Sequence, residues 1–258
     1  GAGSSGPTAA MAEWLGLLRS FLVYWRPGRQ RGLRELYAPL VRAGDLVFDV
    51  GAHLGDRTMA FAGLGARVIA FEPQPFIAYW LRRVVRNHGR VTIRNEAVGR
   101  EPGTARLAVS RRTPTVSTLS ARWQERVVEG NSGFRSVRWD RTVDVPVVTL
   151  DDVIARYGMP SFCKIDVEGH EPEVLAGLSS PLPALSVEFV PGDLSSTTAC
   201  IKRLMQLGRY EYNVVVGERR AFEWVRWQEP EAVIVWLSEG ASGSRSGDVY
   251  ARLVEVEA

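Results

Sequence analysis

The 258-residue sequence predicts an α/β fold in which a mostly parallel sheet carries helices on both of its faces. Two observations support this prediction. Strand-like and helix-like segments alternate through the first half of the chain, as they do in βαβ units. The buried-looking runs LVFDV (46–50) and SFCKI (161–165) each enter a glycine-containing turn and then a helical pattern. Strand patterns that return near the end of the chain are typical of a sheet with an antiparallel edge.

The first half of the chain contains repeated strand and helix patterns. Short β-branched runs predict buried strands, and amphipathic stretches that end near a glycine predict helices. We expect strands at 46–50 and 67–73, a third strand with its exit turn at 90–99, and helices at 56–65 and 75–89. The pattern then changes: GTARLAVS (103–110) and TVDVPVVTL (142–150) predict two antiparallel strands. We therefore expect an insertion at about 100–148, composed of a hairpin and an arginine-rich flap.

The second half begins with a capping box at Thr149, in which Asp152 follows three residues later. This pattern predicts a helix that closes at Gly158. The segment SFCKIDVEGHEPEVLAGL then predicts a strand, a sharp turn and a helix with Pro172 in its first turn. The remaining patterns predict a strand at 184–192, a helix at 197–208, a hairpin at 210–227 and a last strand at 248–256.

Composition indicates a soluble globular protein, with 45% hydrophobic and 24% charged residues and a formal net charge of +3. This charge is far below that of a dedicated nucleic-acid-binding protein. The two cysteines, Cys163 and Cys200, have neither disulfide-framework nor metal-site spacing. We therefore expect a reduced, cytoplasmic protein.

The N-terminal region differs from the rest. Residues 1–10 (GAGSSGPTAA) are expected to be a cloning scar and a disordered leader, and residues 11–40 a helical segment that precedes a domain at 41–258. The apolar stretch WLGLLRSFLVYW (14–25) is too short to span a bilayer and contains Arg19. Two interpretations remain open: a lid that packs on the domain, or an interfacial anchor that makes peripheral membrane contact.

The stretch DVGAHLGD places Asp49, Gly51, His53 and Gly55 at the carboxyl end of the first predicted strand, where open parallel sheets bind ligands. His53 occupies the position at which a dinucleotide-binding loop needs a glycine to approach a pyrophosphate, and no Gly-Lys-Ser/Thr follows. The loop therefore favours a nucleoside without phosphates, of which S-adenosylmethionine is the common example. Asp49 is expected to meet its ammonium group, directly or through water.

Glu72 ends the second predicted strand about 20 residues after the first glycine, the spacing expected of an acid that accepts hydrogen bonds from ribose hydroxyls. One carboxylate can hold both the 2′ and the 3′ hydroxyl. Asn95 and Ala97 follow the third predicted strand and are candidates for contact with the adenine; a plain turn there is the alternative.

The turn KIDVEGHE gathers ionisable groups at the end of a hydrophobic strand. Lys164, Asp166 and Glu168 share one face, and Glu188 ends the neighbouring predicted strand. Burying such groups is costly unless they are paired or functional. A structural Lys–Asp pair with a helix cap is the alternative to a catalytic cluster.

Methyl transfer to a hydroxyl benefits from a base that removes the proton. His170 has a suitable ordinary pKa, although it could instead only cap the helix. Asp166 or Glu168 could orient the hydroxyl or accept its proton. With Glu188, the same carboxylates could hold a Mg²⁺-type ion that acidifies the hydroxyl. The sequence leaves these routes open.

Seven segments of the chain occur in the order seen in the FkbM family of methyltransferases, which the sequence from about residue 33 onward resembles. They are FDVGAHLGDRT, AFEPQP, NEAVG, VVTLDDV, KIDVEGHE, LSVEF and SGDVYAR. The resemblance implies a Rossmann-like class I methyltransferase fold with a seven-stranded sheet and S-adenosylmethionine as donor. It also implies O-methylation of hydroxyls on sugars or natural-product scaffolds.

The resemblance also implies roles for individual residues. Those matching the donor-binding set are Asp49, Gly51, Gly55, Thr58, Glu72, Pro73, Asn95, Ala97 and Ser117, and those matching the acidic turn are Asp166, Glu168 and Gly169. His53 departs from the pattern, because the family usually has Asn there.

Two other functions are weighed against this one. A nucleic-acid methyltransferase would need an Asn/Asp-Pro-Pro-aromatic turn, and the chain has DVEG in its place. A non-catalytic, membrane-associated module would use residues 14–34 and keep its function when Asp166 is replaced. We therefore expect a small-molecule or glycan hydroxyl as acceptor, and no nucleic acid.

Overall fold

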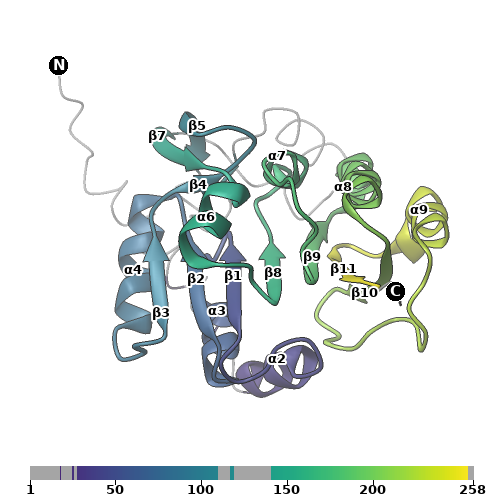
Figure 1. Ribbon diagram of the computed structural model, residues 1–258, viewed down its shortest axis with the longest axis horizontal. Coiled ribbons are helices and arrows are strands. Elements are labelled where there is room, and N and C mark those ends of the chain that lie inside the picture. Colours follow the sequence, from purple (N-terminus) through teal and green to yellow (C-terminus); the bar gives the residue numbers. More distant parts are fainter. Residues whose placement is uncertain (1–17, 19–24, 26–27, 110–116, 119–140, 255–258) are drawn as a thin grey trace.

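A seven-stranded sheet with the order β10–β11–β9–β8–β1–β2–β3 forms the centre of the molecule (Figure 1). The computed structural model describes residues 18, 25, 28–109, 117–118 and 141–254. The strands pair in parallel except β11, which is antiparallel to both of its neighbours. Their bounds are β1 Leu46–Val50, β2 Arg67–Phe71, β3 Val91–Arg94, β8 Phe162–Ile165, β9 Ala184–Phe189, β10 Tyr210–Val216 and β11 Gly247–Leu253. The predicted fold class is confirmed.

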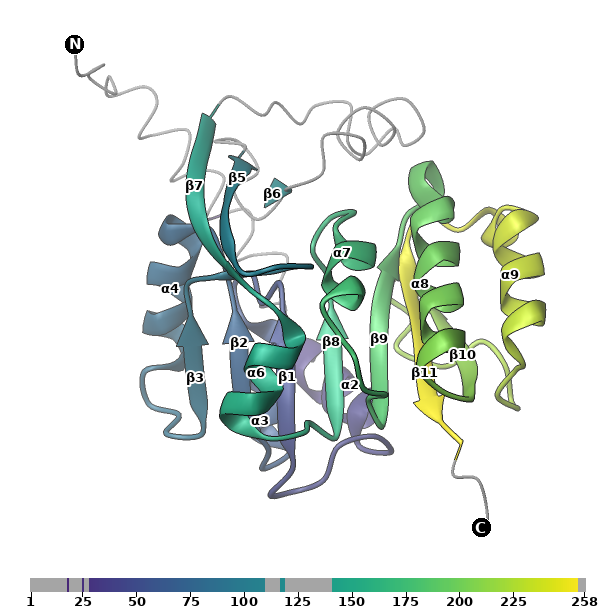
Figure 2. The ribbon, with the colours of Figure 1, turned by 45° about the horizontal axis from the view of Figure 1, so that its top comes forward.

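Helices cover both faces of this sheet (Figure 2). Side chains alternate along each strand, so Val47 and Val68 pack into one core cluster while Phe48 and Ile69 pack into the other. On the face of Val47 lie α2 Arg29–Tyr37, α3 Asp56–Gly63 and α4 Pro75–Val85. On the face of Phe48 lie α6 Leu150–Tyr157, α7 Glu171–Ala176, α8 Leu194–Leu207 and α9 Pro230–Ser238. The predicted capping box opens α6: Asp152 N donates to Thr149 Oγ1 at 3.0 Å.

A second, four-stranded sheet stands above β1 and β2 in Figure 2, in the order β4–β7–β5–β6. Its strands are β4 Ala97–Val98, β5 Gly103–Val109, β6 Ser117–Thr118 and β7 Arg141–Val148. The predicted antiparallel pair is confirmed as β5 and β7. The third strand predicted within 90–99 is β3, and in the segment predicted as its exit turn Ala97–Val98 forms the short strand β4, which pairs with β7. The predicted arginine-rich flap, residues 121–140, lies outside the described residues.

The predicted hairpin at 210–227 is wrong. β10 pairs along its whole length with β11, and the segment that follows it forms no strand; it meets β10 through a bridge between Tyr212 and Gln228 and a 2.8 Å hydrogen bond from Glu223 N–H to the carbonyl of Val214. The physical reason is burial: five consecutive residues of β11 from Gly247 are buried, whereas 218–227 has only partly buried and exposed residues. The helix α9, which the sequence analysis did not predict, begins at Pro230.

The N-terminal segment is described from residue 28 onward, apart from Leu18 and Trp25. Leu33, Leu36 and Tyr37 of α2 are buried against α3 and the sheet. Among the described residues, the structure has no helix whose length and apolar character would let it cross a bilayer.

Candidate active site

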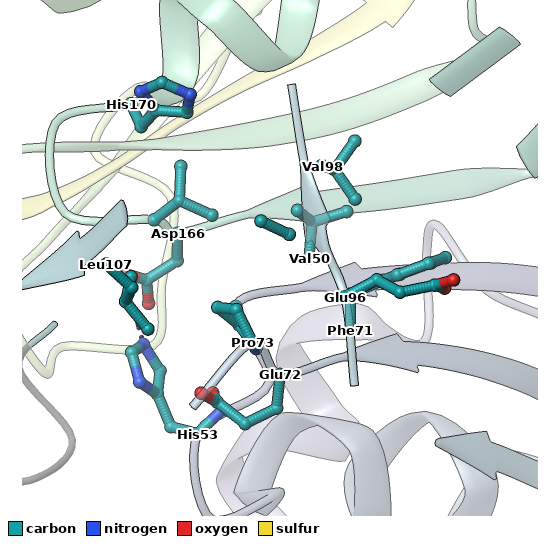
Figure 3. A pocket seen from close by; sticks show the side chains of 13 residues that line it. Val50, His53, Phe71, Glu72, Pro73, Glu96, Val98, Leu107, Asp166 and His170 are labelled. Carbon is teal, nitrogen blue, oxygen red and sulfur yellow. Dashed lines mark hydrogen bonds and ion pairs between the residues drawn. The ribbon is translucent and has the colours of Figure 1, made fainter. Parts of the chain in front are cut away.

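The carboxyl ends of β1, β2 and β8 converge on a cavity of about 410 Å³, which we call the apolar cavity (Figure 3). Its apolar lining comes from two sheets: Val50 and Phe71 from the central one, and Ala97, Val98 and Leu107 from the second, with Pro73 between them. Polar groups reach it from His53, Glu72, Glu96, Asp166 and His170.

Gly51 permits the close approach of two turns at the base of this cavity. It has φ +81°, and a Cβ there would lie 1.7 Å from the backbone oxygen of Asp166. Its N–H donates to the carbonyl of Phe71 at 2.9 Å. Gly51 lines the cavity as predicted, but its need for glycine comes from the protein's own backbone.

Glu72 lies beside the His53 backbone at the wall of the apolar cavity (Figure 3). Its two carboxylate oxygens accept hydrogen bonds from the backbone N–H groups of His53 at 2.9 Å and Gln74 at 3.0 Å. Burial raises the pKa of Glu72 in spite of these bonds. The carboxylate is thus fixed in orientation and retains lone pairs for further donors.

Asn95 supports this wall from behind. Its side-chain amide donates to the backbone carbonyls of Glu72 and Pro73, at 2.8 and 2.9 Å. It is not among the residues that line the cavity, whereas its neighbour Ala97 is. In the structure the Asn95 side chain thus holds the backbone that carries Glu72, and its direct contact with a ligand stays a prediction.

Asp49 does not face the cavity. It is fully buried, its Oδ2 accepts a hydrogen bond from Thr58 Oγ1 at 2.6 Å, and its Oδ1 lies 3.6 Å from Lys164 Nζ. The two side chains bind each other beneath the loop and line neither cavity, so their contact with a ligand stays a prediction. Gly55 also serves the fold: it caps α3 in a left-handed conformation, and a Cβ there would lie 2.4 Å from Leu81 Cδ1.

Lys164 is the buried cation of the site. Its Nζ donates to the carbonyl of Gly51 at 3.0 Å and lies 3.0 Å from Asp166 Oδ2. Burial lowers the pKa of Lys164, but the charges of Asp166 and Asp49 outweigh this and raise it above its ordinary value. Lys164 does not line the apolar cavity; it joins the β1 loop to the acidic turn.

His53 and Asp166 form a pair at the floor of the apolar cavity (Figure 3). His53 Nε2 lies 3.6 Å from Asp166 Oδ1. Burial disfavours the charged imidazole, but the carboxylate of Asp166 outweighs it and raises the pKa of His53 to about 9. Burial likewise disfavours the Asp166 carboxylate, but Lys164 and His53 hold the pKa of Asp166 well below its usual range.

A second cavity of about 570 Å³, which we call the polar cavity, meets the apolar cavity at this pair. His53 and Asp166 line both cavities. Six further charged side chains, from six segments of the chain, line the polar cavity: Arg29, Arg57, Glu168, Glu188, Glu218 and Asp248.

The predicted carboxylates of the acidic turn and of β9 face the polar cavity. Burial, reinforced by the charge of Asp166, raises the pKa of Glu168 to about 8 and that of Glu188 well above its ordinary value. Glu171 accepts hydrogen bonds from the backbone N–H groups of Val167 and Gly169, and burial raises its pKa to about 7. The structure thus brings Glu168, Glu188 and Asp166 together, as the sequence predicted.

His170 occupies a different place from these carboxylates. It precedes α7 at the N-cap position without a side-chain capping bond, and it lines the apolar cavity but not the polar one. Burial lowers the pKa of His170. The backbone of Ser117, in β6, pairs with that of Val109, in β5.

His53, Asp166 and Glu168 each offer a ligand atom, and these atoms lie within 4.8 Å of one another. However, Lys164 Nζ already lies 3.0 Å from one Asp166 oxygen, and His53 Nε2 lies 3.6 Å from the other. A divalent ion would therefore meet two positively charged neighbours. Mg²⁺ also prefers an all-oxygen set. The residues fit a Mg²⁺ site poorly.

Sequence reasoning missed several residues of the site. Arg29, Arg57, Glu218 and Asp248 line the polar cavity, and Phe71, Glu96 and Leu107 line the apolar one. Arg57 and Asp248 belong to the segments FDVGAHLGDRT and SGDVYAR, which carry the family resemblance, so their place in these segments was an available indication. Arg29, Glu218 and Leu107 carried no local pattern, because only the topology of the fold brings them to the site.

Comparison with known proteins identifies the family. The model of the Methyltransferase FkbM domain matches residues 49–242. The 31-O-demethyl-FK506 methyltransferase FkbM of Streptomyces tacrolimicus is 35% identical over 159 residues, which are 54% of this chain and 61% of the relative. The hexuronic acid methyltransferase AglP of Haloferax volcanii is 28% identical over 174 residues, or 64% of each chain. The alignments thus span less than two thirds of the length of either relative.

Two of the solved structures that align with this chain do so at low identity. The precorrin-6y C5,15-methyltransferase of Geobacter metallireducens has a TM-score of 0.47 and 12% identity, with 88% of this chain and 86% of that chain covered. The Bacillus cereus O-methyltransferase in complex with SAH has a TM-score of 0.45 and 14% identity, with 98% and 93% covered. The family match, which includes the β1 loop, β2 and the acidic turn, shows that this chain belongs to the FkbM family of methyltransferases.

Proposed function

We propose that this protein is an O-methyltransferase that moves the methyl group of S-adenosylmethionine to a hydroxyl of a sugar, a glycan or a natural-product scaffold. One observation carries the proposal: an apolar cavity and a polar cavity meet at His53 and Asp166. A transferase for two different ligands needs two sites that share a boundary, and its reacting groups belong at that boundary.

The apolar cavity is the proposed donor site. Glu72 supplies an oriented carboxylate for the ribose hydroxyls, and the aliphatic residues Val98 and Leu107 supply a surface for the adenine. The carboxylate of Glu96, already held by Arg94 through two bonds of 2.8 Å, lies at the same wall. Two acids at the wall and apolar contacts between them suit a nucleoside better than a phosphorylated cofactor.

The bound donor supplies an electrophilic methyl group, and the protein's own residues supply the acid–base chemistry. We propose that His53 accepts the proton of the acceptor hydroxyl, because its imidazole lines both cavities. Asp166 orients that imidazole and stabilises its protonated form. His170 lines only the proposed donor site, so we do not propose it as the proton acceptor.

The relatives support an acceptor that is not a nucleic acid. One carries FK506 in its name and the other hexuronic acid, and both are methyltransferases. Cys163 and Cys200 are free and buried, which suits a cytoplasmic enzyme. In this proposal the catalytic domain spans 41–258. The preceding α2 acts as a cover for the site and not as a membrane anchor, because Arg29 contributes to the wall of the polar cavity.

Titration calorimetry with S-adenosylhomocysteine tests the proposed donor site. Glu72→Ala should weaken binding by about 1–3 kcal/mol, the scale of lost charge-assisted hydrogen bonds. Glu101→Ala, at an exposed position between β4 and β5, is the matched control and should leave the affinity unchanged. Wild-type protein that does not bind S-adenosylhomocysteine, or equal affinities for wild type and Glu72→Ala, would overturn the assignment.

A further inference from the structure

The wall of the polar cavity has an unusual composition for a small-molecule site. Among the described residues that line it, none is aliphatic, and its one ring is the imidazole of His53. The remaining lining consists of charged side chains and the residues Gly217, Ser246 and Gly247. Most small-molecule sites are predominantly apolar with a few polar groups. This wall therefore favours a ligand that presents polar atoms on most of its surface.

Arg57, in the first turn of α3, is the donor in this wall whose hydrogen-bonding capacity is least used. Its Nε is buried and makes no hydrogen bond with the described residues. Its two terminal nitrogens lie 3.6 Å from Asp56 Oδ2 and 3.7 Å from Asp248 Oδ2, which is beyond hydrogen-bond distance. A guanidinium has five N–H donors, and leaving them unpaired in a partly buried place is costly.

Arg29, the other arginine of the wall, is held differently. Its Nε and Nη2 each lie 2.7 Å from Asp56 Oδ2, and its Nη1 lies 2.6 Å from Glu218 Oε2. These short contacts fix the α2 helix over the cavity. The comparison separates the two arginines by role: Arg29 holds the wall together, whereas Arg57 has donors to offer to a ligand.

The charges of the wall argue against an anionic ligand. Two arginines and His53 face the carboxyl groups of Asp166, Glu168, Glu188, Glu218 and Asp248. Each arginine also has an acid as its nearest ionic partner. Because burial and neighbouring charges raise the pKa values of Glu168 and Glu188, these two groups favour their neutral form, and the remaining charged groups balance one another. A carboxylated or phosphorylated ligand would therefore meet no surplus of positive charge. Hydroxyl groups, which donate and accept, match both the carboxyl oxygens and the free N–H groups of Arg57.

We infer, on the basis of the function proposed above, that the polar cavity is the acceptor site and takes a neutral, polyhydroxylated sugar ring, with Arg57 as the residue that binds its oxygens. The reacting hydroxyl lies at the boundary with the apolar cavity. There its oxygen forms a bond to the methyl carbon while the carbon–sulfur bond of the donor breaks. The hydroxyl proton passes to His53, and the neutral thioether S-adenosylhomocysteine leaves.

Saturation-transfer NMR on protein saturated with S-adenosylhomocysteine tests this inference. The probes are the methyl glycosides of glucose, galactose, mannose and rhamnose, methyl glucuronoside as an anionic sugar, and cyclohexanol as an apolar alcohol. At least one neutral glycoside should bind, more tightly than methyl glucuronoside, and cyclohexanol should not. Arg57→Gln should weaken the binding of the neutral glycoside at least tenfold. Arg57→Lys keeps the charge but loses the planar guanidinium with its fixed set of N–H donors, and it should give an intermediate loss of affinity.

The control substitution is Arg106→Gln, whose side chain is 77% exposed on β5 and should not change glycoside binding. S-adenosylhomocysteine affinity, measured on each variant, reports whether the fold and the donor site are intact. If the donor binds normally but no neutral glycoside does, or Arg57→Gln binds glycosides like the wild type, this inference fails while the proposed function stands. Tighter binding of the glucuronoside would overturn the neutral-sugar assignment. Wild-type protein that fails to bind the donor would overturn the proposed function itself.

Discussion

His53 Nε2 lies 3.6 Å from Asp166 Oδ1, and the two residues form the boundary between the cavities. His53 reaches this place because its backbone adopts a left-handed conformation, with φ 50°, while its N–H donates to Glu72. Asp166 reaches it because its backbone passes against Gly51. One short loop therefore fixes the carboxylate proposed for the ribose and the imidazole proposed for the proton.

The pH dependence of turnover should report His53. Asp166 raises the pKa of His53 to about 9, so at neutral pH most of the imidazole carries a proton and cannot accept another. Below that pKa the neutral fraction rises tenfold for each pH unit. We expect kcat/KM, measured with an identified acceptor, to rise with pH and to level off near pH 9.

The substitution His53→Asn should remove this rising limb and lower turnover by about 10²–10⁴-fold, the usual contribution of a positioned base. His88→Asn, at an exposed position after α4, is the matched control and should keep the wild-type profile. A His53→Asn enzyme with a wild-type pH profile would rule out the proposed role. A His170→Asn enzyme that keeps the wild-type pH profile would show that His53, and not His170, causes the rise with pH.

Replacement of Lys164 should destabilise the protein strongly. Its Nζ lies 3.0 Å from Asp166 and 3.6 Å from Asp49, and its side chain is 2% exposed. Lys164→Met leaves two buried carboxylates without their cation, which costs about 3–5 kcal/mol when one partner of a buried pair is removed. Urea denaturation should show this loss, and Lys202→Met, at an exposed position of α8, should change the free energy of unfolding by less than about 0.5 kcal/mol. A small effect of Lys164→Met would mean that the carboxylates are neutral in the folded protein.

Much of this architecture was predictable from sequence because its determinants are local. The apolar run at 46–50, the capping box at Thr149 and the turn after β8 each depend on neighbouring residues, and each was found. The strand that pairs with β10, by contrast, lies far from it in the sequence. β11 follows β10 only after an irregular segment and α9, so the sequence pattern favoured a nearby return strand that the protein does not form.

The site shows the same division. Glu72, Asp166 and Glu188 end strands of one sheet, so their convergence followed from topology. Whether a side chain faces a ligand or another side chain was not readable in this way. Asp49 lies near the carboxyl end of β1 and Asp166 directly follows β8, yet Asp49 is fully buried against Thr58 while Asp166 lines both cavities. Arg29 and Glu218, 189 residues apart, meet only in the folded chain.

Removal of divalent ions should leave the reaction unaffected. Lys164 and His53 already compensate the charge of Asp166, and the reaction as proposed uses His53 for the proton. We expect enzyme dialysed against EDTA to keep its turnover within about twofold, and added Mg²⁺ to have no effect. Loss of turnover in EDTA that Mg²⁺ or Mn²⁺ restores would instead favour a metal held by Asp166 and Glu168.

The substitution Gly51→Ala should test how closely the β1 loop and the acidic turn must approach. Alanine at a positive φ costs about 1–2 kcal/mol wherever it occurs. At Gly51 the added Cβ would also lie 1.7 Å from the backbone oxygen of Asp166, and a backbone atom cannot move aside as a flexible side chain can. Gly44 has φ +91° and nothing within 4 Å of its added Cβ, so Gly44→Ala measures the conformational cost alone.

We therefore expect urea denaturation to show a larger loss for Gly51→Ala than for Gly44→Ala, by at least the about 1–3 kcal/mol typical of overpacking. Because the displaced group is the backbone of Asp166, the affinity for S-adenosylhomocysteine should fall in Gly51→Ala and stay unchanged in Gly44→Ala. Equal losses of stability in the two variants would show that the acidic turn moves away from the β1 loop without cost. The boundary between the two cavities would then not depend on the contact between Gly51 and Asp166.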